Sequence, residues 1–237
     1  MGYRQAGFVV TGWELHPRQC GYPAGVLIEG DATQALADLA YLRKFDLIHA
    51  SPPCQPYTRA SHLRTAQGKE SLKADLVGLT HDALVASGVP YVIENVPGAP
   101  MRTDLTMCGS FFPELSVGEG KARRWLQRHR IFEIGNWSVR TPFQPPCRHT
   151  SGRKLKQISH HRPVGVYHKL DDAIPHGGQT AKTLAEARQV MGIDWMSFDA
   201  LAEAIPPAYT RYIATSYLRS ISQPSFSRSD SPGMSNH

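Results

Sequence analysis

The sequence predicts an α/β fold with a doubly wound, mostly parallel sheet, because short apolar runs alternate with helix-like stretches along its first half. The runs have the length of buried strands, and the stretches between them carry apolar residues at helical spacing. The predicted strands are residues 8–13, 26–28, 45–50 and 91–93, and the predicted helices between them are residues 32–43 and 75–87. Strands linked in this way pair in parallel, so their carboxyl ends meet at one edge of the sheet.

A cysteine follows the third apolar run, in the segment SPPCQP at residues 51–56. The prolines end the strand and stiffen the turn after it. Cys54 is therefore expected on a rigid loop at the edge where ligands of open α/β sheets bind. A thiol in that place is a candidate nucleophile. The alternative is that Cys54 is a small buried apolar residue, as most free cysteines are.

Acidic residues follow the other three apolar runs. Glu14, Asp31 and Glu94 each come at the end of a predicted strand. They are expected at the same edge of the sheet as Cys54. Asp31 directly precedes a predicted helix, so a role as the helix N-cap is equally open. Glu94 has the alternative of a helix cap or a surface acid.

Several motifs occur in a fixed order along most of the chain. Pro-Cys-Gln at residues 53–55 is followed forty residues later by Glu-Asn-Val at residues 94–96. Four further segments are Cys108–Phe112, Gln127–Glu133, Arg188–Gly192 and Ala204–Tyr209. With this set of motifs, residues 2–218 resemble the DNA cytosine-5 methyltransferase family, and most of all its short phage and prophage members. The resemblance implies a Rossmann-like fold that uses S-adenosylmethionine.

The resemblance also implies roles for individual residues at the catalytic edge. Cys54 would add to carbon 6 of a cytosine flipped out of duplex DNA. Glu94 would share a proton with ring nitrogen 3. Arg128 and Arg130 would hold the base carbonyl and help to lower the thiol pKa. The i, i+2 spacing of the two arginines suits the start of a strand with both side chains on one face, although basic runs are often a solvated surface.

The cofactor side of the same edge is expected to bind S-adenosylmethionine. By the resemblance, Glu14 would bind the ribose hydroxyls, and Asp31 and Ala32 would lie near the adenine. Pro52 and Pro53 would line the cofactor side of the cysteine loop.

The positive charge of the chain is concentrated in one window. Residues 121–170 hold twelve Lys or Arg and one acid, whereas the rest of the chain holds fourteen basic and nineteen acidic residues. Such a window favours a polyanion partner, and the resemblance makes that partner double-stranded DNA. The basic segment 57–73 is either a lid over the DNA or an ordinary surface loop. The candidate DNA contacts are Gln55, Arg59, Arg64, Arg148, Arg153, Lys154 and Lys156.

The sequence departs from the family at its beginning. The family's first strand and its Phe-x-Gly-x-Gly turn are absent, and residues 1–7 resemble the helix just after that turn. The absent piece is on the order of fifteen residues by typical strand and loop lengths. Its loss is expected to leave a gap in the sheet beside residues 8–13. A misassigned start, a decayed gene and a strand supplied from elsewhere are the three explanations.

The motifs, the basic window and the composition divide the chain into four regions. They are an α/β core with the catalytic and cofactor sites (residues 1–135), a short basic target-recognition region (136–180), helices that return to the core (181–222) and a disordered tail rich in Ser and Pro (223–237).

Composition predicts a cytoplasmic monomer with no membrane span, no signal peptide and four reduced cysteines. A zinc site is conceivable at Cys147, His149, His160, His161, His168 and His176, but the spacing fits no common zinc module, so no metal is expected.

The predicted activity is methyl transfer from S-adenosylmethionine to carbon 5 of a flipped cytosine through a covalent cysteine adduct. The alternative is a truncated, catalytically impaired relic that still binds DNA. A thiol enzyme acting on a free pyrimidine is a weaker third possibility, because it leaves the basic window unexplained. Pairing with a restriction enzyme stays open.

Overall fold

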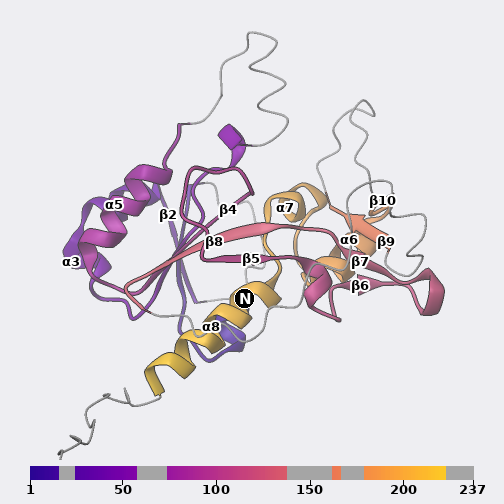
Figure 1. Ribbon diagram of the computed structural model, residues 1–237. Coiled ribbons are helices and arrows are strands. Elements are labelled where there is room, and N and C mark those ends of the chain that lie inside the picture. The colour runs from indigo at the N-terminus through magenta and orange to yellow at the C-terminus, as the bar shows by residue number, and fades with distance from the viewer. Residues whose placement is uncertain (16–24, 58–73, 138–161, 167–178, 223–237) are drawn as a thin grey trace, which may run out of the picture.

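The structure, a computed structural model, describes residues 1–15, 25–57, 74–137, 162–166 and 179–222 (Figure 1). Strands and helices alternate along the described residues, so the expected α/β class is confirmed. The strands are β1 (Thr11–Glu14), β2 (Val26–Glu29), β3 (Ile48–Ala50), β4 (Tyr91–Asn95), β5 (Leu105–Met107), β6 (Ser116–Val117), β7 (Arg124–Leu126), β8 (Arg130–Gly135), β9 (Arg162–Gly165) and β10 (Gln179–Thr180).

The helices follow the predicted pattern with shifted ends. They are α1 (Gly2–Gln5), α2 (Ala32–Ala37), α3 (Leu39–Leu42), α5 (Val77–Ser87), α6 (Leu184–Met191), α7 (Phe198–Glu203) and α8 (Pro207–Ser222), with 3₁₀ turns at η1 (Gln55–Tyr57), η2 (Gly109–Phe111) and η3 (Gly120–Ala122). No helix in the described part of the chain combines the length and the apolarity of a membrane span.

The described strands form three sheets, which mix parallel and antiparallel pairs. Their orders are β1-β2, β3-β4-β8-β5 and β10-β9-β7-β6. The β1·β2 and β3·β4 pairs are parallel, as expected, but β8 runs antiparallel to both β4 and β5. The expectation of a mostly parallel sheet is therefore corrected to mixed sheets. The reason is that no helix lies between β4 and β8 to carry the chain back across the sheet.

The first two strands are separate from the next two. β1 is hydrogen-bonded to β2 and β3 to β4, and no bond joins β1 to β3 in the described residues. This separation lies where the sequence predicts a gap beside residues 8–13.

The predicted helix 32–43 is broken in two at Asp38. The Asp38 carboxylate accepts a hydrogen bond from the Tyr41 amide at 2.9 Å, so it caps the N-terminus of α3. Its own extended backbone ends α2. The predicted helix 75–87 forms as α5, where Asp75 accepts from the Val77 amide and Gly88 ends the helix with a positive φ.

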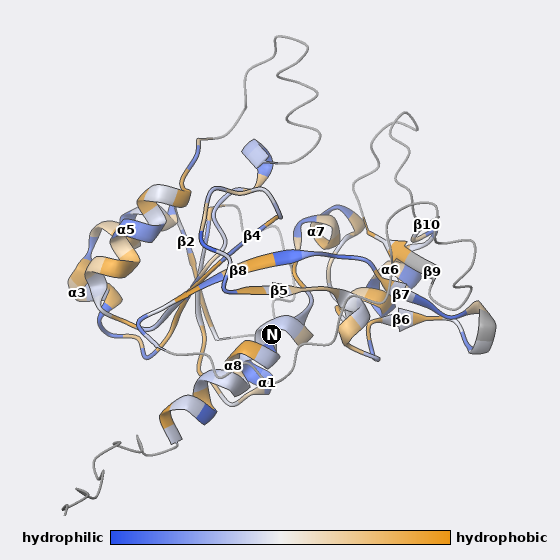
Figure 2. Cartoon of the chain, in the orientation of Figure 1, coloured by the Kyte–Doolittle hydropathy of each residue, from blue (hydrophilic) through white to orange (hydrophobic). Residues whose placement is uncertain are grey.

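Helices pack on both faces of the β3-β4-β8-β5 sheet. On one face, Leu36 and Leu39 pack with Tyr91 and Ile93. On the other face, α8 packs against Val92 and Phe132 through its own buried residues. α1 lies against α8, where the N-terminus of the chain is found (Figure 1). Figure 2 shows the hydrophobic stretches on β5, β8 and α3 that form these layers.

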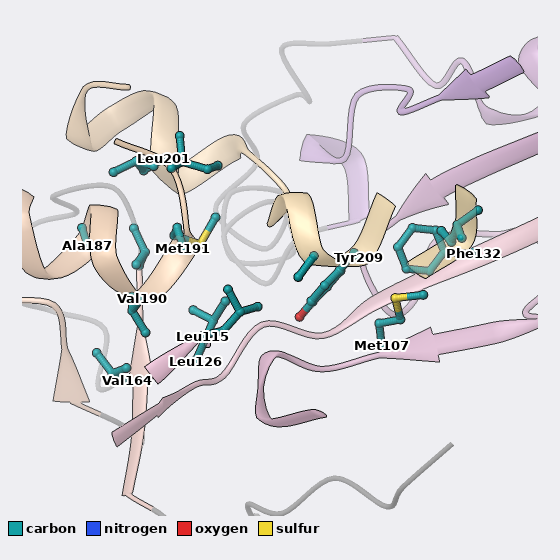
Figure 3. Packing of buried hydrophobic residues seen from close by; sticks show 14 of the residues in the cluster. Met107, Leu115, Leu126, Phe132, Val164, Ala187, Val190, Met191, Leu201 and Tyr209 are labelled. Carbon is teal, nitrogen blue, oxygen red and sulfur yellow. The ribbon is translucent and has the colours of Figure 1, made fainter. Parts of the chain in front are cut away.

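The larger hydrophobic core continues from this sheet into the sheet of β6, β7, β9 and β10. Figure 3 shows Phe132 and Tyr209 at one end of the core and Val190 of α6 at the other, with Leu115 and Leu126 between them. β9 and β10 belong to the expected recognition region 136–180, yet they share a sheet with β6 and β7 from the preceding region. The described residues 162–165 and 179–180 are thus joined to the core by strand pairing.

Gly2 should be required for the packing of α1 on α8. A Cβ at Gly2 would lie 2.1 Å from the Pro207 carbonyl oxygen, whereas a Cβ at Gly78 in α5 would meet nothing within 4 Å. We expect Gly2→Ala to lower the free energy of unfolding by about 1–3 kcal/mol, as overpacked sites do. Gly78→Ala, the matched control, should be neutral or stabilising. Urea unfolding measures both, and equal effects would contradict this packing.

Candidate active site

The cysteine loop is tied to the end of β4. The Asn95 side-chain amide donates to the Pro52 carbonyl oxygen at 3.2 Å, and Pro52 is buried. The turn after Cys54 closes through a bond of 3.0 Å from the Tyr57 amide to the Cys54 carbonyl oxygen. Cys54 is therefore held at the carboxyl end of β3 by a neighbouring parallel strand, as the sequence predicts.

Glu94 and Arg130 form an ion pair near this loop. Glu94 of β4 lies opposite Phe132 of β8, and Arg130 is two residues earlier on β8, so its side chain lies on the same face of the sheet as that of Phe132. The Arg130 Nε donates to a Glu94 carboxylate oxygen at 2.8 Å, and the two side chains are only 12% and 8% exposed. The antiparallel pairing of β4 and β8 thus brings together two predicted catalytic residues.

The electrostatics of Cys54 connect it to this ion pair. Burial raises the pKa of the Cys54 thiol above its ordinary value, and the negative charge of Glu94 acts in the same direction. Arg130, and to a smaller extent Arg128, lower the pKa but do not outweigh burial. The two arginines thus lower the pKa of the thiol, as expected. The net shift is still upward, so Cys54 is mainly a neutral thiol at pH 7 in the free protein.

Arg128 is buried in a different setting from Arg130. Its guanidinium donates to the Val166 carbonyl oxygen at 3.1 Å and to the Ala202 carbonyl oxygen at 2.7 Å. The Tyr209 hydroxyl donates in turn to the Arg128 carbonyl oxygen at 2.5 Å. These bonds join β9, α7 and α8 around the start of β8. A contact of Arg128 with a base stays a prediction, and its described bonds hold the segment before β8 to Val166 and to Ala202 of α7.

The cofactor candidates lie at the carboxyl ends of β1, β2 and β3. Glu14 ends β1 opposite Glu29 of β2, and both strands point the same way. Asp31 caps α2: its carboxylate accepts from the Thr33 amide at 2.9 Å, a bond that lowers the pKa of Asp31. The sequence leaves open whether Asp31 is the N-cap of a helix, and the structure shows that it is. Glu14, Asp31 and Ala32 are exposed, Pro52 is buried and Pro53 is half-buried.

The sequence-based prediction missed a chain of hydrogen bonds that runs from Tyr3 through His49 to Ser51, at the start of the cysteine loop. The Tyr3 hydroxyl lies 2.7 Å from His49 Nδ1, and the Ser51 hydroxyl lies 3.3 Å from His49 Nε2. Burial lowers the pKa of His49 to about 4 and raises that of Tyr3. Because a neutral imidazole has one N–H and one bare nitrogen, His49 donates to one of these two hydroxyls and accepts from the other. Asn95 is a second residue that sequence reasoning missed, although it stands within the Glu-Asn-Val motif that could have indicated it.

Most of the predicted DNA contacts lie outside the described residues. These are Arg59, Arg64, Arg148, Arg153, Lys154 and Lys156, together with the residues of the conceivable zinc site and most of the predicted lid. Gln55 is described, and it begins η1 as a half-buried residue. Among the described residues, no group of three or more His, Cys, Asp or Glu could hold a metal ion. Cys54 and Cys108 are free thiols.

Comparison with known proteins gives no match to any protein-family model and none to any curated protein. The resemblance to the methyltransferase family therefore stays a prediction from the sequence motifs.

The reactivity of Cys54 should depend on Arg130. We expect the alkylation rate with iodoacetamide to rise with pH above neutrality, because burial raises the thiol pKa. Arg130→Ala should slow alkylation at pH 7.5 by roughly tenfold, the effect of about one pKa unit, because it removes the stronger opposing cation. Mass spectrometry of the labelled protein measures the rate. Cys20→Ser and Cys147→Ser provide the background in which the label reports on Cys54, since Cys108 is fully buried.

Arg211→Ala is the matched control for that experiment. Arg211 pairs with Glu114 at 2.6 Å on the surface, so its loss should leave the alkylation rate unchanged. An Arg130→Ala protein that reacts as fast as the parent would contradict the electrostatic link.

The half-buried His49 should make the protein less stable in acid. Its pKa of about 4 in the folded state lies below the ordinary value of 6.5, so the unfolded chain binds the proton first. The stabilisation from neutral His49 is full above pH 6.5 and is lost as the pH falls toward 4, by up to about 3 kcal/mol. His49→Asn, which keeps a hydrogen-bond partner for Tyr3, should flatten this part of the stability curve. His129→Asn should keep the parent curve. Identical curves for both variants would refute the assignment.

Proposed function

We propose that the chain is a DNA cytosine-5 methyltransferase. The observation that carries the proposal is the placement of a thiol loop next to a buried carboxylate–guanidinium pair. Cys54 and Glu94 come from the carboxyl ends of two adjacent parallel strands, and Arg130 comes from the antiparallel neighbour. A nucleophile, a proton-sharing acid and a cation are the three groups that addition to a pyrimidine ring requires.

The chemistry assigned to these groups proceeds by addition and elimination. The Cys54 thiolate adds to carbon 6, and the electron pair of the 5,6 double bond makes carbon 5 enamine-like. Glu94 shares a proton with ring nitrogen 3, which limits the negative charge on the ring, and Arg130 holds the carboxyl of Glu94 in place. Carbon 5 would then take the methyl group of S-adenosylmethionine, whose S–CH3 bond breaks and whose sulfur leaves as a neutral thioether. Loss of the proton from carbon 5 to water and departure of the thiolate restore the double bond.

The raised pKa of the Cys54 thiol is compatible with this sequence. A thiol that stays neutral in the free protein avoids oxidation and alkylation until a substrate is present. Arg130 and Arg128 already lower the pKa, so a base that displaces water around them would strengthen their effect.

S-adenosylmethionine would supply the methyl group. Glu14 and Asp31 fit its adenosine part, because carboxylates at the carboxyl ends of two parallel strands can accept bonds from ribose hydroxyls and from an amino group. Pro52, buried beside the thiol loop, would separate this side from the base.

DNA is proposed as the partner because of the basic window at residues 121–170. In the described part of that window, the β6–β7 hairpin presents Arg123, which is exposed and lies 5.6 Å from the centre of the Trp125 ring. Its Nε donates to the Ser116 hydroxyl at 3.0 Å. An arginine held in this way can still offer its outer nitrogens to a phosphate.

A non-catalytic DNA-binding relic is the second candidate. The observation that favours it is the separation of β1 from β3 in the described residues, together with the exposure of Glu14, Asp31 and Ala32. Few side chains at this place could cover a bound cofactor. This candidate keeps the basic surface and loses methyl transfer.

Methyl transfer separates the two candidates. Labelled S-adenosylmethionine and mixed-sequence duplex DNA are incubated with the chain, and the nucleosides are then separated. We expect label in 5-methylcytosine, none with Cys54→Ala, and a rate at least about a hundredfold lower with Glu94→Gln, which cannot give up a proton.

The control for Glu94→Gln is Glu114→Gln, a surface acid paired with Arg211, which should leave the rate unchanged. Salt-dependent DNA binding without any label would favour the relic. Label that persists in Cys54→Ala would exclude the proposed nucleophile.

A further inference from the structure

The β6–β7 hairpin has two different faces. In its antiparallel register, Val117 lies opposite Arg124, and Ser116 lies opposite Trp125. Arg124 forms an ion pair with Glu186 of α6, so its side chain lies on the face of the hairpin that packs against α6. Successive side chains of a strand point to opposite faces. Trp125 and its cross-strand neighbour Ser116 therefore lie on the outer face, which is turned away from α6.

The inner face fixes the hairpin to the rest of the molecule. Leu126 is fully buried in the larger core, and Val117 packs against that core. The Arg124 and Glu186 side chains that join the hairpin to α6 are only 17% and 11% exposed. β7 also pairs with β9 along its whole length. The outer face of the hairpin is therefore presented by a rigid support.

Arg123 lies across this outer face. Its guanidinium carbon is 5.6 Å from the centre of the Trp125 ring, and its Nε donates to the Ser116 hydroxyl at 3.0 Å. The Ser116 hydroxyl donates in turn to the Pro113 carbonyl oxygen at 2.8 Å, so its oxygen is free to accept the bond from Arg123. The aromatic ring and the hydroxyl hold the guanidinium in one orientation before any ligand arrives, which lowers the entropy lost on binding.

The charge of Arg123 is available to a ligand. The side chain is exposed, and no carboxylate of the described residues pairs with it. Its Nε is used by Ser116, and the described part of the chain gives its two terminal nitrogens no partner. A planar guanidinium that presents two nitrogens side by side matches two oxygens of one phosphate.

The hairpin belongs to the basic window and leads directly to the candidate active site. Residues 121–170 hold twelve Lys or Arg and one acid. β9 begins at Arg162, whose backbone lies opposite that of Arg124. β7 continues through residues 127–129 into β8, which begins at Arg130. Figure 1 shows the hairpin at the end of the molecule away from α3 and α5. A phosphate bound there would have a fixed position relative to Arg130.

We propose that the outer face of the β6–β7 hairpin binds the phosphate backbone of duplex DNA, with Arg123, stacked on Trp125, as the phosphate contact. This inference rests on the DNA partner of the proposed function, which the methyltransferase and the relic share. The contact precedes the expected recognition region 136–180, so two separate parts of the chain would hold the duplex. Because phosphates carry no sequence information, Arg123 would bind any duplex equally.

The salt dependence of DNA binding tests this contact. The affinity of the chain for several duplexes of unrelated sequence is measured by fluorescence anisotropy between roughly 50 and 200 mM salt. We expect Arg123→Ala to reduce the slope of log K against log salt by about 0.9, the value of one phosphate contact. It should also weaken binding by about tenfold with every duplex. Arg123→Lys keeps the charge and loses the planar stack, so it should keep the slope and lose part of the affinity.

Arg219→Ala is the matched control, because it removes the same charge from an exposed position on α8. It should leave both the slope and the affinity unchanged. A parental slope in Arg123→Ala overturns the proposal. So does a loss of affinity confined to one duplex, which would make Arg123 a base contact, and so does an equal change in Arg219→Ala, which would reflect net charge alone.

Methyl transfer measured on the same samples separates this inference from the proposed function. If the parent binds DNA without transferring methyl groups, the proposed function fails and the result for Arg123 still stands. Methyl transfer together with an unchanged salt slope in Arg123→Ala overturns the hairpin contact alone. A parent without salt-dependent DNA binding overturns the hairpin contact whatever its activity.

Discussion

The buried ion pair between Glu94 and Arg130 is the interaction on which the rest of the candidate site depends. Both side chains are almost fully covered, and the attraction between them offsets the cost of burying the two charges. The pair forms only if β8 returns antiparallel along β4 in the observed register. The parallel pairing of β3 with the other edge of β4 places Asn95 where it holds the Pro52 carbonyl and, through it, the Cys54 loop. The two strand registers of β4 therefore set the positions of nucleophile, acid and cation together.

The sequence predicts the local elements and the candidate nucleophile well, because their signals are local. Apolar runs and the Pro-Pro turn specify β1 to β4 and the Cys54 loop with few alternatives. The direction of β8 is not local information: the sequence suggests a strand after Arg130, and only the packing of the sheet decides its neighbours. The break of the helix at Asp38 is similar, because a capping aspartate is also tolerated on a helix surface.

The contacts that sequence reasoning missed join parts of the chain that are far apart in sequence. His49 reads as one residue of an apolar run, and its role follows from Tyr3, forty-six residues earlier, and from burial of its ring. The sequence suggests that Arg128 and Arg130 act together, but their side chains have different surroundings. Arg128 binds the carbonyl oxygens of Val166 and Ala202. Arg130 binds the carboxylate of Glu94. A spacing of two residues predicts a common face only where both residues lie within one regular strand, and Arg128 precedes β8.

Exchange of the cytosine C5 hydrogen tests the central claim most directly, because it needs the Cys54 adduct and no cofactor. Addition of the thiolate at carbon 6 makes carbon 5 basic; in D₂O it takes a deuteron, and elimination returns a labelled cytosine. The chain is incubated with duplex DNA in D₂O, and the masses of the nucleosides are then measured by mass spectrometry. The account predicts deuterium at C5 that is absent with Cys54→Ala. DNA that is bound but gains no deuterium, or deuterium that persists without Cys54, would contradict it.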